Sequence, residues 1–509
     1  MTYRVVWFKR DLRVHDHAPL VEAARLGPVL CLYIVEPALW RQPDAARQHL
    51  GFVRDSLRDL RADLRRLGAR LHWAVGDAVD VLQRINDQAP FLELLSHQET
   101  GNAVSFERDL RVQRWCRAQA KPWREFRQFG VVRGLRERRH WVRQWEQLTH
   151  ETQQAVRSLQ DAPVPQHADA WPSADALGLP DHEPPQRQRG GRVAGESVLQ
   201  EFLLERSARY RGGISSPLSA PTACSRLSPY LTWGCLSLRE VVQSTRCRLE
   251  HPGLPPHQRL GLEGFLSRLH WHCHFIQKLE TEPAIEHANM HRGYDGLREP
   301  DHNPAHLQAL VEGRTGWPLV DACVAMLRET GWLNFRMRAM LVSVAAYPLW
   351  LHWRPVGEWL AREFLDYEPG IHWSQLQMQS GTTGINTTRV YNPIKQARDH
   401  DPQGRFVRQW LPAMRRVPDA WLFEPWRMPP DVQARCGVVV GRDIAQPVVD
   451  LEAAMRDAKQ RLYARRTAPD VVAAQDGIVR RHGSRSRGAE NLARARTPDT
   501  PCQTSLDFS

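Results

Sequence analysis

With 509 residues, 42% of them hydrophobic and 25% charged, the chain is long enough for two or three globular domains. No apolar run reaches the length of a membrane span, and the N-terminal segment lacks the apolar centre of a secretory signal. Nine scattered cysteines without a C-x-x-C pair disfavour structural zinc and disulfides. We therefore expect a cytoplasmic protein. The net charge of +12 favours a polyanionic partner, nucleic acid first, although many arginine-rich proteins bind none.

The first 135 residues alternate between strand-like and helix-like patterns. Strands are expected at residues 3–8, 28–37, 69–75 and 91–99, and helices at residues 18–27, 49–68 and 78–86. This alternation predicts an α/β domain with a doubly wound parallel sheet, whose ligands gather at the carboxyl ends of the strands. No G-x-G-x-x-G motif follows the first strand, so an ordinary dinucleotide site is not expected there.

The remaining chain divides into a connector, a helical domain and a tail. Residues 136–195 form the connector, which becomes rich in Pro, Gly, Asp and Gln after residue 160. Strand patterns nearly vanish beyond it, so we expect one all-helical domain over residues 196–466. Residues 467–509 are expected to be a disordered basic tail.

One helical stretch, "GWLNFRMRAM", carries two cations that cannot share a helical face. Arg336 and Arg338 are two residues apart, so at least one of them should point inward, near Trp332 and Asn334. The chain also holds nineteen tryptophans. Core packing is the ordinary explanation for each one, whereas the group as a whole suggests stacking on a planar ligand or electron transfer to one.

The run "TACSRLSPYLTWGCLS" places hydroxyl groups beside a predicted helix start. Free backbone N–H groups there, with Ser225 and Ser228 nearby, suit a pyrophosphate. Ordinary helix capping by the same serines is the alternative.

Six motifs, in this order along the chain, resemble the DNA photolyase and cryptochrome family. They are "VVWFKRDLRVHDHAPL", "SRLSPYLTWGCLS", "NPAHLQALVEGRTGWPLVDACVAMLRETGWLNFRMR", "LDYEPG", "RVYNPIKQARDHDPQGRFVRQWLP" and "FEPW". The resemblance covers about residues 2–426. It implies FAD held in a folded form within the helical domain and an antenna-type N-terminal domain that can hold a second chromophore of unidentified kind.

The resemblance also implies the residues that hold FAD. Cys224 stands in place of the usual threonine in the family's phosphate-binding run, and Tyr210 matches a tyrosine ahead of that run across a loop of different length. Arg338 and Asp366 match an ion pair beside the isoalloxazine ring, where a positive charge favours the anionic reduced flavin. The full implied set is Tyr210, Cys224, Ser225, Arg226, Leu227, Ser228, Arg338, Asp366, Tyr367, Glu368 and His372, of which Arg338, Asp366 and His372, together with Trp353, are expected to act in catalysis.

The activity implied is light-driven repair of UV-damaged DNA, in which reduced FAD donates an electron to a flipped-out pyrimidine dimer. The residues expected to contact DNA are Arg268, Trp271, His272, Asn334, Phe335 and Met378. A cryptochrome-type photoreceptor without repair activity is the main alternative. A light-independent flavin oxidoreductase is a third, without a nicotinamide motif to support it.

Several positions depart from the family pattern and leave the lesion open between cyclobutane dimer, (6-4) photoproduct and none. Arg268 replaces a glutamate that assists repair, and Phe335 replaces an asparagine that reaches the lesion. Met378 replaces a second lesion-facing tryptophan. His372 falls at the position facing flavin N5, where a shift of one residue would substitute Trp373.

The tryptophan relay that photoreduces the flavin in this family is also altered. Trp353 matches its middle member, whereas Leu376 and Pro300 occupy the flavin-proximal and surface positions. The relay is therefore either broken or rerouted, with Trp350, Trp359 and Trp373 as candidates.

The last residues, "PCQTSLDFS", suggest a protein partner. Gln503, Leu506 and Phe508 fit Q-x-x-L-x-F, which resembles the peptides that dock bacterial repair proteins on the replication sliding clamp. An inert tail is the alternative, and the protein itself is expected to be a monomer.

Overall fold

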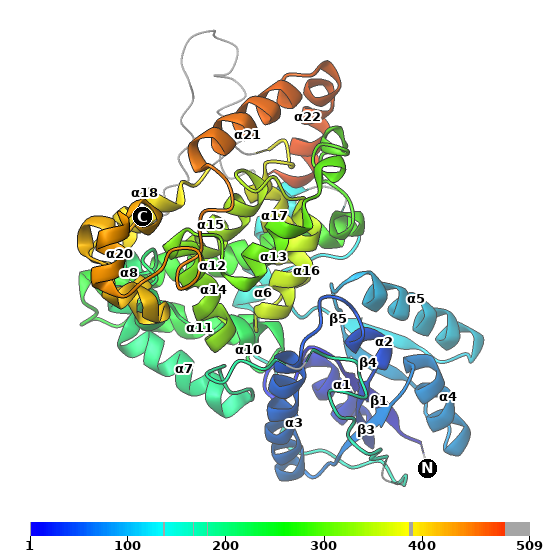
Figure 1. Cartoon of the computed structure of the whole chain (residues 1–509). Coiled ribbons are helices and arrows are strands. Elements are labelled where there is room, and N and C mark those ends of the chain that lie inside the picture. The colour runs from blue at the N-terminus through cyan, green and yellow to red at the C-terminus, as the bar shows by residue number, and fades with distance from the viewer. Residues whose placement is uncertain (1, 136–137, 166, 181, 386–389, 484–509) are drawn as a thin grey trace.

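The computed structural model describes residues 2–135, 138–165, 167–180, 182–385 and 390–483. Figure 1 shows an N-terminal α/β domain packed against a larger helical body. This arrangement confirms the fold class expected from the sequence, a parallel sheet domain followed by an all-helical domain.

The N-terminal domain is built on a five-stranded parallel sheet of order β3-β2-β1-β4-β5. β1 and β2 are apolar almost throughout because helices cover both faces of the sheet. The four expected strands are present, whereas β5, four half-exposed residues with a central charge pair, gives no strand signal in the sequence. The strands are β1 (Arg4–Phe8), β2 (Val29–Val35), β3 (Leu71–Val75), β4 (Leu94–His97) and β5 (Trp123–Phe126).

The helices of this domain cross between the parallel strands. They are α1 (Ala18–Leu26), α2 (Pro37–Trp40), α3 (Arg47–Leu67), α4 (Ala78–Gln88) and α5 (Ala103–Ala118). From β1 the chain proceeds to β2 and β3 on one side, and it returns to β4 and β5 on the other. The strand order therefore reverses between β1 and β4, the place where such sheets bind ligands at their carboxyl ends.

The connector holds α6 (Trp141–His150) and a long irregular segment that returns over the sheet domain. Isolated bridges join Val29 to Asp161 and Trp73 to Ala168. The second bridge covers β3, an edge strand that would otherwise present unpaired backbone groups.

The rest of the chain is helical. The helices are α7 (Arg192–Leu204), α8 (Tyr210–Gly213), α9 (Ala220–Ala223), α10 (Ser228–Thr232), α11 (Leu238–Leu249), α12 (Pro256–Thr281), α13 (Pro304–Glu312), α14 (Pro318–Thr330), α15 (Phe335–Ala346), α16 (Trp353–Glu363), α17 (Pro369–Ser380), α18 (Pro393–His400), α19 (Arg405–Trp410), α20 (Pro430–Cys436), α21 (Leu451–Arg466) and α22 (Pro469–His482).

Two boundaries differ from the sequence expectation. The stretch at residues 331–340, expected to lie in one helix, is divided, because Gly331 adopts a left-handed φ of 65° that ends α14 and α15 begins only after Asn334. The tail does not begin at residue 467, because α22 continues the helical body and packs near Tyr294, where Val471 is 3% exposed.

The two domains are joined by hydrogen bonds from α3 and from the loop after β1. His49 on α3 shares a 2.9 Å hydrogen bond with the Phe364 carbonyl, and the Gln48 amide donates to the Arg362 carbonyl at 2.6 Å. After β1, the Arg10 guanidinium donates to the Tyr367 carbonyl at 2.9 Å. The segment between α16 and α17 is therefore fixed from the N-terminal side.

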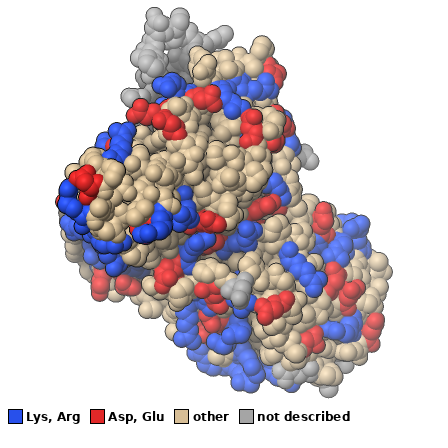
Figure 2. Space-filling view, viewed as in Figure 1, with Lys and Arg blue, Asp and Glu red and all other residues tan. Residues whose placement is uncertain are grey.

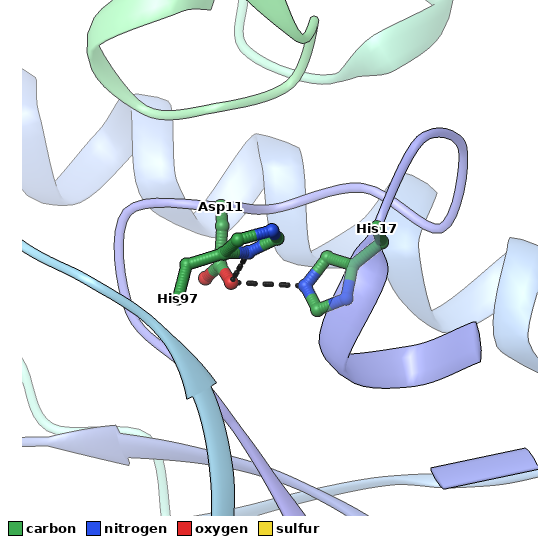
Figure 3. A group of neighbouring side chains, drawn as sticks. All are labelled: Asp11, His17 and His97. Carbon is green, nitrogen blue, oxygen red and sulfur yellow. Dashed lines mark hydrogen bonds and ion pairs between the residues drawn. The ribbon is translucent and has the colours of Figure 1, made fainter. Parts of the chain in front are cut away.

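A buried histidine–aspartate–histidine cluster anchors the loop that carries Arg10 (Figure 3). Asp11 Oδ2 lies 2.9 Å from His17 Nε2 and 2.7 Å from His97 Nδ1. The Leu20 N–H donates to His17 Nδ1, so the proton of His17 lies on Nε2 and points at Asp11. Although these ligand atoms lie within 4.8 Å of one another, a metal ligand needs a free lone pair at Nε2, so this tautomer suits a hydrogen-bonded anchor.

The cluster also fixes its own charge state. Burial alone raises the pKa of Asp11, but the hydrogen bonds from His17 and His97 outweigh it and hold that pKa well below its usual range. Burial lowers the pKa of His97 to about 3. The loop is therefore held by one carboxylate and two neutral imidazoles.

Candidate functional site

The centre of the candidate site is a two-pronged ion pair between Arg338 on α15 and Asp366 in the loop between α16 and α17. Arg338 Nη1 lies 2.9 Å from Asp366 Oδ1, and Nη2 lies 3.0 Å from Oδ2. Arg338 Nε donates to the Leu333 carbonyl at 2.6 Å, and its guanidinium lies 4.1 Å from the centre of the Phe364 ring. The expectation that Arg338 points inward and pairs with Asp366 is confirmed.

The carboxylate of Asp366 is ionised despite its burial. Its side chain is 5% exposed, and burial alone raises its pKa. The charge and hydrogen bonds of Arg338, with a hydrogen bond from Ser228, outweigh burial and lower the pKa of Asp366 below its usual value. The pair therefore presents a fixed guanidinium charge within a largely dry site.

The expected phosphate-binding run forms a turn between α9 and α10. The Ser228 hydroxyl donates to Asp366 Oδ2 at 2.6 Å and does not cap α10, so the ordinary capping alternative is wrong for this serine. Arg226 adopts a left-handed φ of 58°, which costs a non-glycine residue about 1 kcal/mol. Gln188 offsets this strain by bonding both the Arg226 guanidinium (3.0 Å) and its carbonyl (2.9 Å).

Three guanidinium groups surround this turn. Arg206 donates to the Cys224 carbonyl at 2.8 Å, and Arg226 stacks 4.0 Å from the centre of the Trp332 ring. Burial raises the pKa of Cys224 to about 12 even though Arg226, Arg338 and Arg206 oppose that rise, so the thiol stays neutral. A turn with cationic neighbours and a neutral thiol suits the anionic pyrophosphate of a dinucleotide.

An unpartnered buried oxygen lies at the start of α15. The Asn334 amide nitrogen donates to the carbonyls of Ile214 and Ser215 at 3.0 and 2.9 Å, whereas its Oδ1 has no partner within the described residues. Asn334 is only 2% exposed. Leaving such an acceptor unsatisfied costs about 1–3 kcal/mol, and a donor on a bound ligand would remove that cost. Together with the cationic turn, this atom fits a site for FAD.

Two aromatic residues of α17 lie beside this centre. His372 Nε2 shares a 2.9 Å hydrogen bond with the Gly357 carbonyl, and burial lowers the pKa of His372 to about 4, so its ring is neutral near pH 7. The Trp373 ring lies 4.9 Å from His372 and 5.8 Å from Trp353. Trp353 donates from its indole nitrogen to Asn289 Oδ1 at 2.7 Å.

Tyr367 and Glu368 do not turn towards the ion pair. The Tyr367 hydroxyl donates to Asp44 in the N-terminal domain at 2.6 Å, and Glu368 pairs with Arg10 at 3.3 Å. The structure thus places these two expected cofactor residues at the domain interface. Because they directly follow Asp366 in the chain, their contacts with the N-terminal domain fix the position of its backbone.

The expected DNA-contact residues of α12 contact two different parts of the protein. Arg268 hydrogen-bonds the Tyr210 hydroxyl, and Trp271 is half-buried with its ring stacked 5.8 Å from Phe275. His272 instead meets Phe129 of the N-terminal side edge-on at 5.2 Å.

The other expected residues are more scattered. Phe335 is 42% exposed at the start of α15, and Met378 is half-buried on α17. Leu376 is buried beside Gly357. The clamp-like residues Gln503, Leu506 and Phe508 lie outside the described residues, and their role stays a prediction.

Sequence reasoning missed Arg206 and Gln188, which hold the strained turn, and Asn289, which fixes Trp353. Each acts through a contact between segments far apart in the chain, so no local pattern could have identified it.

A partly open cleft lies where the sheet meets the helical domain. It opens at the carboxyl ends of β1, β2 and β4 and is lined by Trp7, Tyr33, Trp40, Trp233, Lys9 and Glu36. Aromatic walls and a few charged groups suit a planar ligand.

Comparisons with known proteins agree with this geometry. The family model for DNA photolyase matches residues 4–132, and the model for the FAD binding domain of DNA photolyase matches residues 265–464. A deoxyribodipyrimidine photo-lyase of Streptomyces griseus is 31% identical over 89% of this chain and 97% of its own length. The chain belongs to the DNA photolyase and cryptochrome family.

Other relatives in this photolyase and cryptochrome family carry both kinds of name. A cryptochrome DASH of Gloeobacter violaceus is 29% identical over 88% of this chain and 93% of its own length. A class III photolyase of Agrobacterium tumefaciens shares the fold, with a TM-score of 0.79 at 22% identity over 92% of this chain and 98% of its own. A Synechocystis cryptochrome shares it with a TM-score of 0.80 at 21% identity over 90% and 99% of the two chains.

Membership of this family confirms FAD as the cofactor for which the helical domain is built. An archaeal photolyase from Sulfolobus tokodaii with two FAD molecules has the same fold, with a TM-score of 0.73 at 23% identity over 91% of this chain and all of its own. Among the described residues, no helix is both long and apolar enough to cross a bilayer.

We expect Asp366→Asn to weaken both folding and FAD retention. The substitution leaves the Arg338 guanidinium without a carboxylate, which for a largely buried pair lowers the free energy of unfolding by about 3 kcal/mol. Thermal unfolding and the FAD content of the purified protein measure the two effects. The matched control is Asp399→Asn, which breaks the exposed Lys395–Asp399 pair and should change the free energy of unfolding by less than about 1 kcal/mol. Equal behaviour of the two variants would contradict this role.

Proposed function

We propose that this protein repairs UV-induced pyrimidine dimers in DNA with light, using electron transfer from reduced FAD. The observation that carries the proposal is the buried Arg338–Asp366 pair beside the cationic turn at residues 224–228. When bound and reduced, FAD supplies the electron that splits the dimer and takes the electron back afterwards.

Within this proposal, the side chains hold charge and exclude water. Arg338 keeps one positive charge beside the flavin ring, and Asp366 makes burying that charge tolerable. His372 stays neutral because of burial and is oriented by the Gly357 carbonyl, so it offers a hydrogen-bonding edge without adding charge. Arg226 would hold the phosphates of the cofactor, and Arg206 fixes the backbone of the turn through the Cys224 carbonyl.

Contact with the lesion is proposed for one face of α12. Arg268 and Trp271 are three residues apart and therefore share a helical face. The half-buried indole of Trp271 is available for stacking on an unpaired base. Arg268 replaces the negative charge expected there with a positive one, which suits the phosphates flanking a flipped-out dimer.

A photoreceptor without repair activity is the alternative, and two positions favour it: Arg268, which replaces a glutamate that assists repair, and Phe335. Phe335, at the place of a lesion-reaching asparagine, is 42% exposed and offers no hydrogen-bonding group from its side chain. A photoreceptor would use the same flavin site but would leave lesions in DNA unchanged.

The repair proposal predicts that the reduced protein removes dimers from an irradiated oligonucleotide under blue light and removes none in darkness. Trp271→Ala should weaken binding of the damaged oligonucleotide by about fivefold or more, because one stacked base is worth about 1–3 kcal/mol. Lesion counts and binding titrations measure these outcomes, with Trp421→Ala as the matched control. If neither cyclobutane dimers nor (6-4) photoproducts decrease under light, the repair proposal is lost and the photoreceptor alternative stands.

We also propose that Trp373 and Trp353 replace the altered relay. Trp373 lies between His372 and Trp353 at ring separations of 4.9 and 5.8 Å, and its buried indole N–H has no partner within the described residues. Trp373 would pass one electron towards the flavin and regain one from Trp353, with an external thiol as the final donor. Trp350 and Trp359 remain candidates for the later steps.

Trp373→Phe should slow blue-light reduction of the bound flavin at least tenfold while leaving the amount of bound FAD unchanged. Absorbance at the flavin bands during illumination with a thiol present measures the rate. Trp317→Phe is the matched control, since Trp317 is a buried tryptophan of the same core. Equal rates in the two variants would exclude this route.

For the second chromophore, we propose the cleft between the domains. Trp7, Trp40 and Trp233 give it planar apolar walls, and it opens at the carboxyl edge of the sheet.

A further inference from the structure

The solvent-facing side of α3 carries a line of arginines on the N-terminal domain. Arg54, Arg58, Arg61 and Arg65 follow one another at intervals of four, three and four residues, and all four are exposed. At about 100° per residue they fall within an arc of about 60° and extend over about 16 Å of helix. Figure 2 shows blue side chains gathered over the region of α3. We call these four residues the α3 arginine stripe.

The acidic residues of α3 are directed elsewhere and leave the stripe largely uncompensated. Asp55 accepts from Arg187 of the connector at 3.1 Å, and Asp59 accepts from the Val193 N–H at 3.0 Å. Asp63 pairs with Arg66, outside the arc of the stripe. Asp55 also contacts Arg58 at 3.3 Å, but the side chain of Arg58 remains 59% exposed.

A row of like charges at these spacings costs the helix stability. Each unfavourable pair at i,i+3 or i,i+4 costs about 0.2–0.5 kcal/mol. A polyanion lying along the row would remove this cost and release its own counterions. The stripe is therefore a surface whose charge is better matched in a complex than in the free protein.

The surroundings of the stripe decide between classes of polyanion. The apolar face of α3 is buried, with Val53, Leu57 and Leu64 in the sheet domain and Phe52 against Tyr230 of the helical domain, so the helix has nothing to insert into a lipid surface. The stripe has no exposed aromatic or aliphatic anchor between its arginines, whereas protein interfaces are built around such anchors. Guanidinium groups match phosphate oxygens with two parallel hydrogen bonds. These observations favour a nucleic-acid backbone.

We propose that the α3 arginine stripe binds the sugar-phosphate backbone of duplex DNA, as a contact separate from the lesion-facing side of α12. The choice of DNA among nucleic acids rests on the proposed function. Figure 1 shows α3 in the N-terminal domain and α12 in the helical body. The contact is made to phosphates alone, so it is independent of sequence and of damage.

The test compares two full-length variants with equal loss of charge. One is Arg54→Gln/Arg58→Gln/Arg61→Gln/Arg65→Gln, and the control changes four exposed arginines elsewhere, Arg114, Arg117, Arg456 and Arg466, to Gln. Fluorescence anisotropy with an undamaged labelled duplex gives Kd at several salt concentrations. We expect the stripe variant to bind at least tenfold more weakly at low salt, and its plot of log affinity against log salt to become shallower by about 3.6, at 0.9 for each of four lost phosphate contacts. A variant with four lysines should retain most of the slope.

Three outcomes would overturn the proposal: equal Kd and slope for the stripe and control variants, no binding of undamaged duplex by the unaltered protein, or loss of binding to anionic vesicles without loss of binding to duplex. Circular dichroism and thermal unfolding establish that both variants are folded. The preference for damaged over undamaged duplex should stay unchanged in the stripe variant. Because dimer removal under light is scored separately, failure of repair and failure of the stripe are distinguishable.

Discussion

The ion pair between Arg338 and Asp366 connects every part of the candidate site. It joins α15 to the loop between α16 and α17, and the same carboxylate accepts from Ser228 in the strained turn. The next two residues along the chain, Tyr367 and Glu368, bind Asp44 and Arg10 of the sheet domain. One buried carboxylate therefore places the Arg338 guanidinium, the turn at residues 224–228 and the domain interface in a fixed relation.

That relation explains why the anchoring of the Arg10 loop matters for a site in the other domain. Asp11 accepts hydrogen bonds from two neutral histidines and so fixes the loop after β1. Arg10, on the same loop, donates to the Tyr367 carbonyl beside Asp366. The cleft at the carboxyl edge of the sheet shares Tyr367 and Arg10 with this interface. A chromophore in the cleft would therefore contact the same short segment that carries the ion pair.

Local patterns predict the parts of the structure that depend on local physics. The apolar runs of β1 to β4 and the spacing of Arg336 and Arg338 identify the sheet and the inward cation, because burial and helical geometry act within a few residues. The break at Gly331, the donation from Ser228 to Asp366 and the outward turn of Tyr367 depend on contacts between distant segments. The resemblance to the photolyase and cryptochrome family identified Ser228, Asp366 and Tyr367 as members of one site. It did not say which way their side chains point.

The photolyase and cryptochrome relatives leave repair and signalling as two uses of one flavin site. In both proposals, the residues that meet DNA, Arg268 and Trp271 on α12 and the α3 arginine stripe, lie apart from those proposed to hold the flavin.

The most direct measurement is the absorption spectrum of the protein as purified from cells, with the flavin released and counted against the chain. The account requires one FAD per chain, bound beside Arg338 and Asp366. A colourless protein that takes up no FAD when the cofactor is added would contradict it.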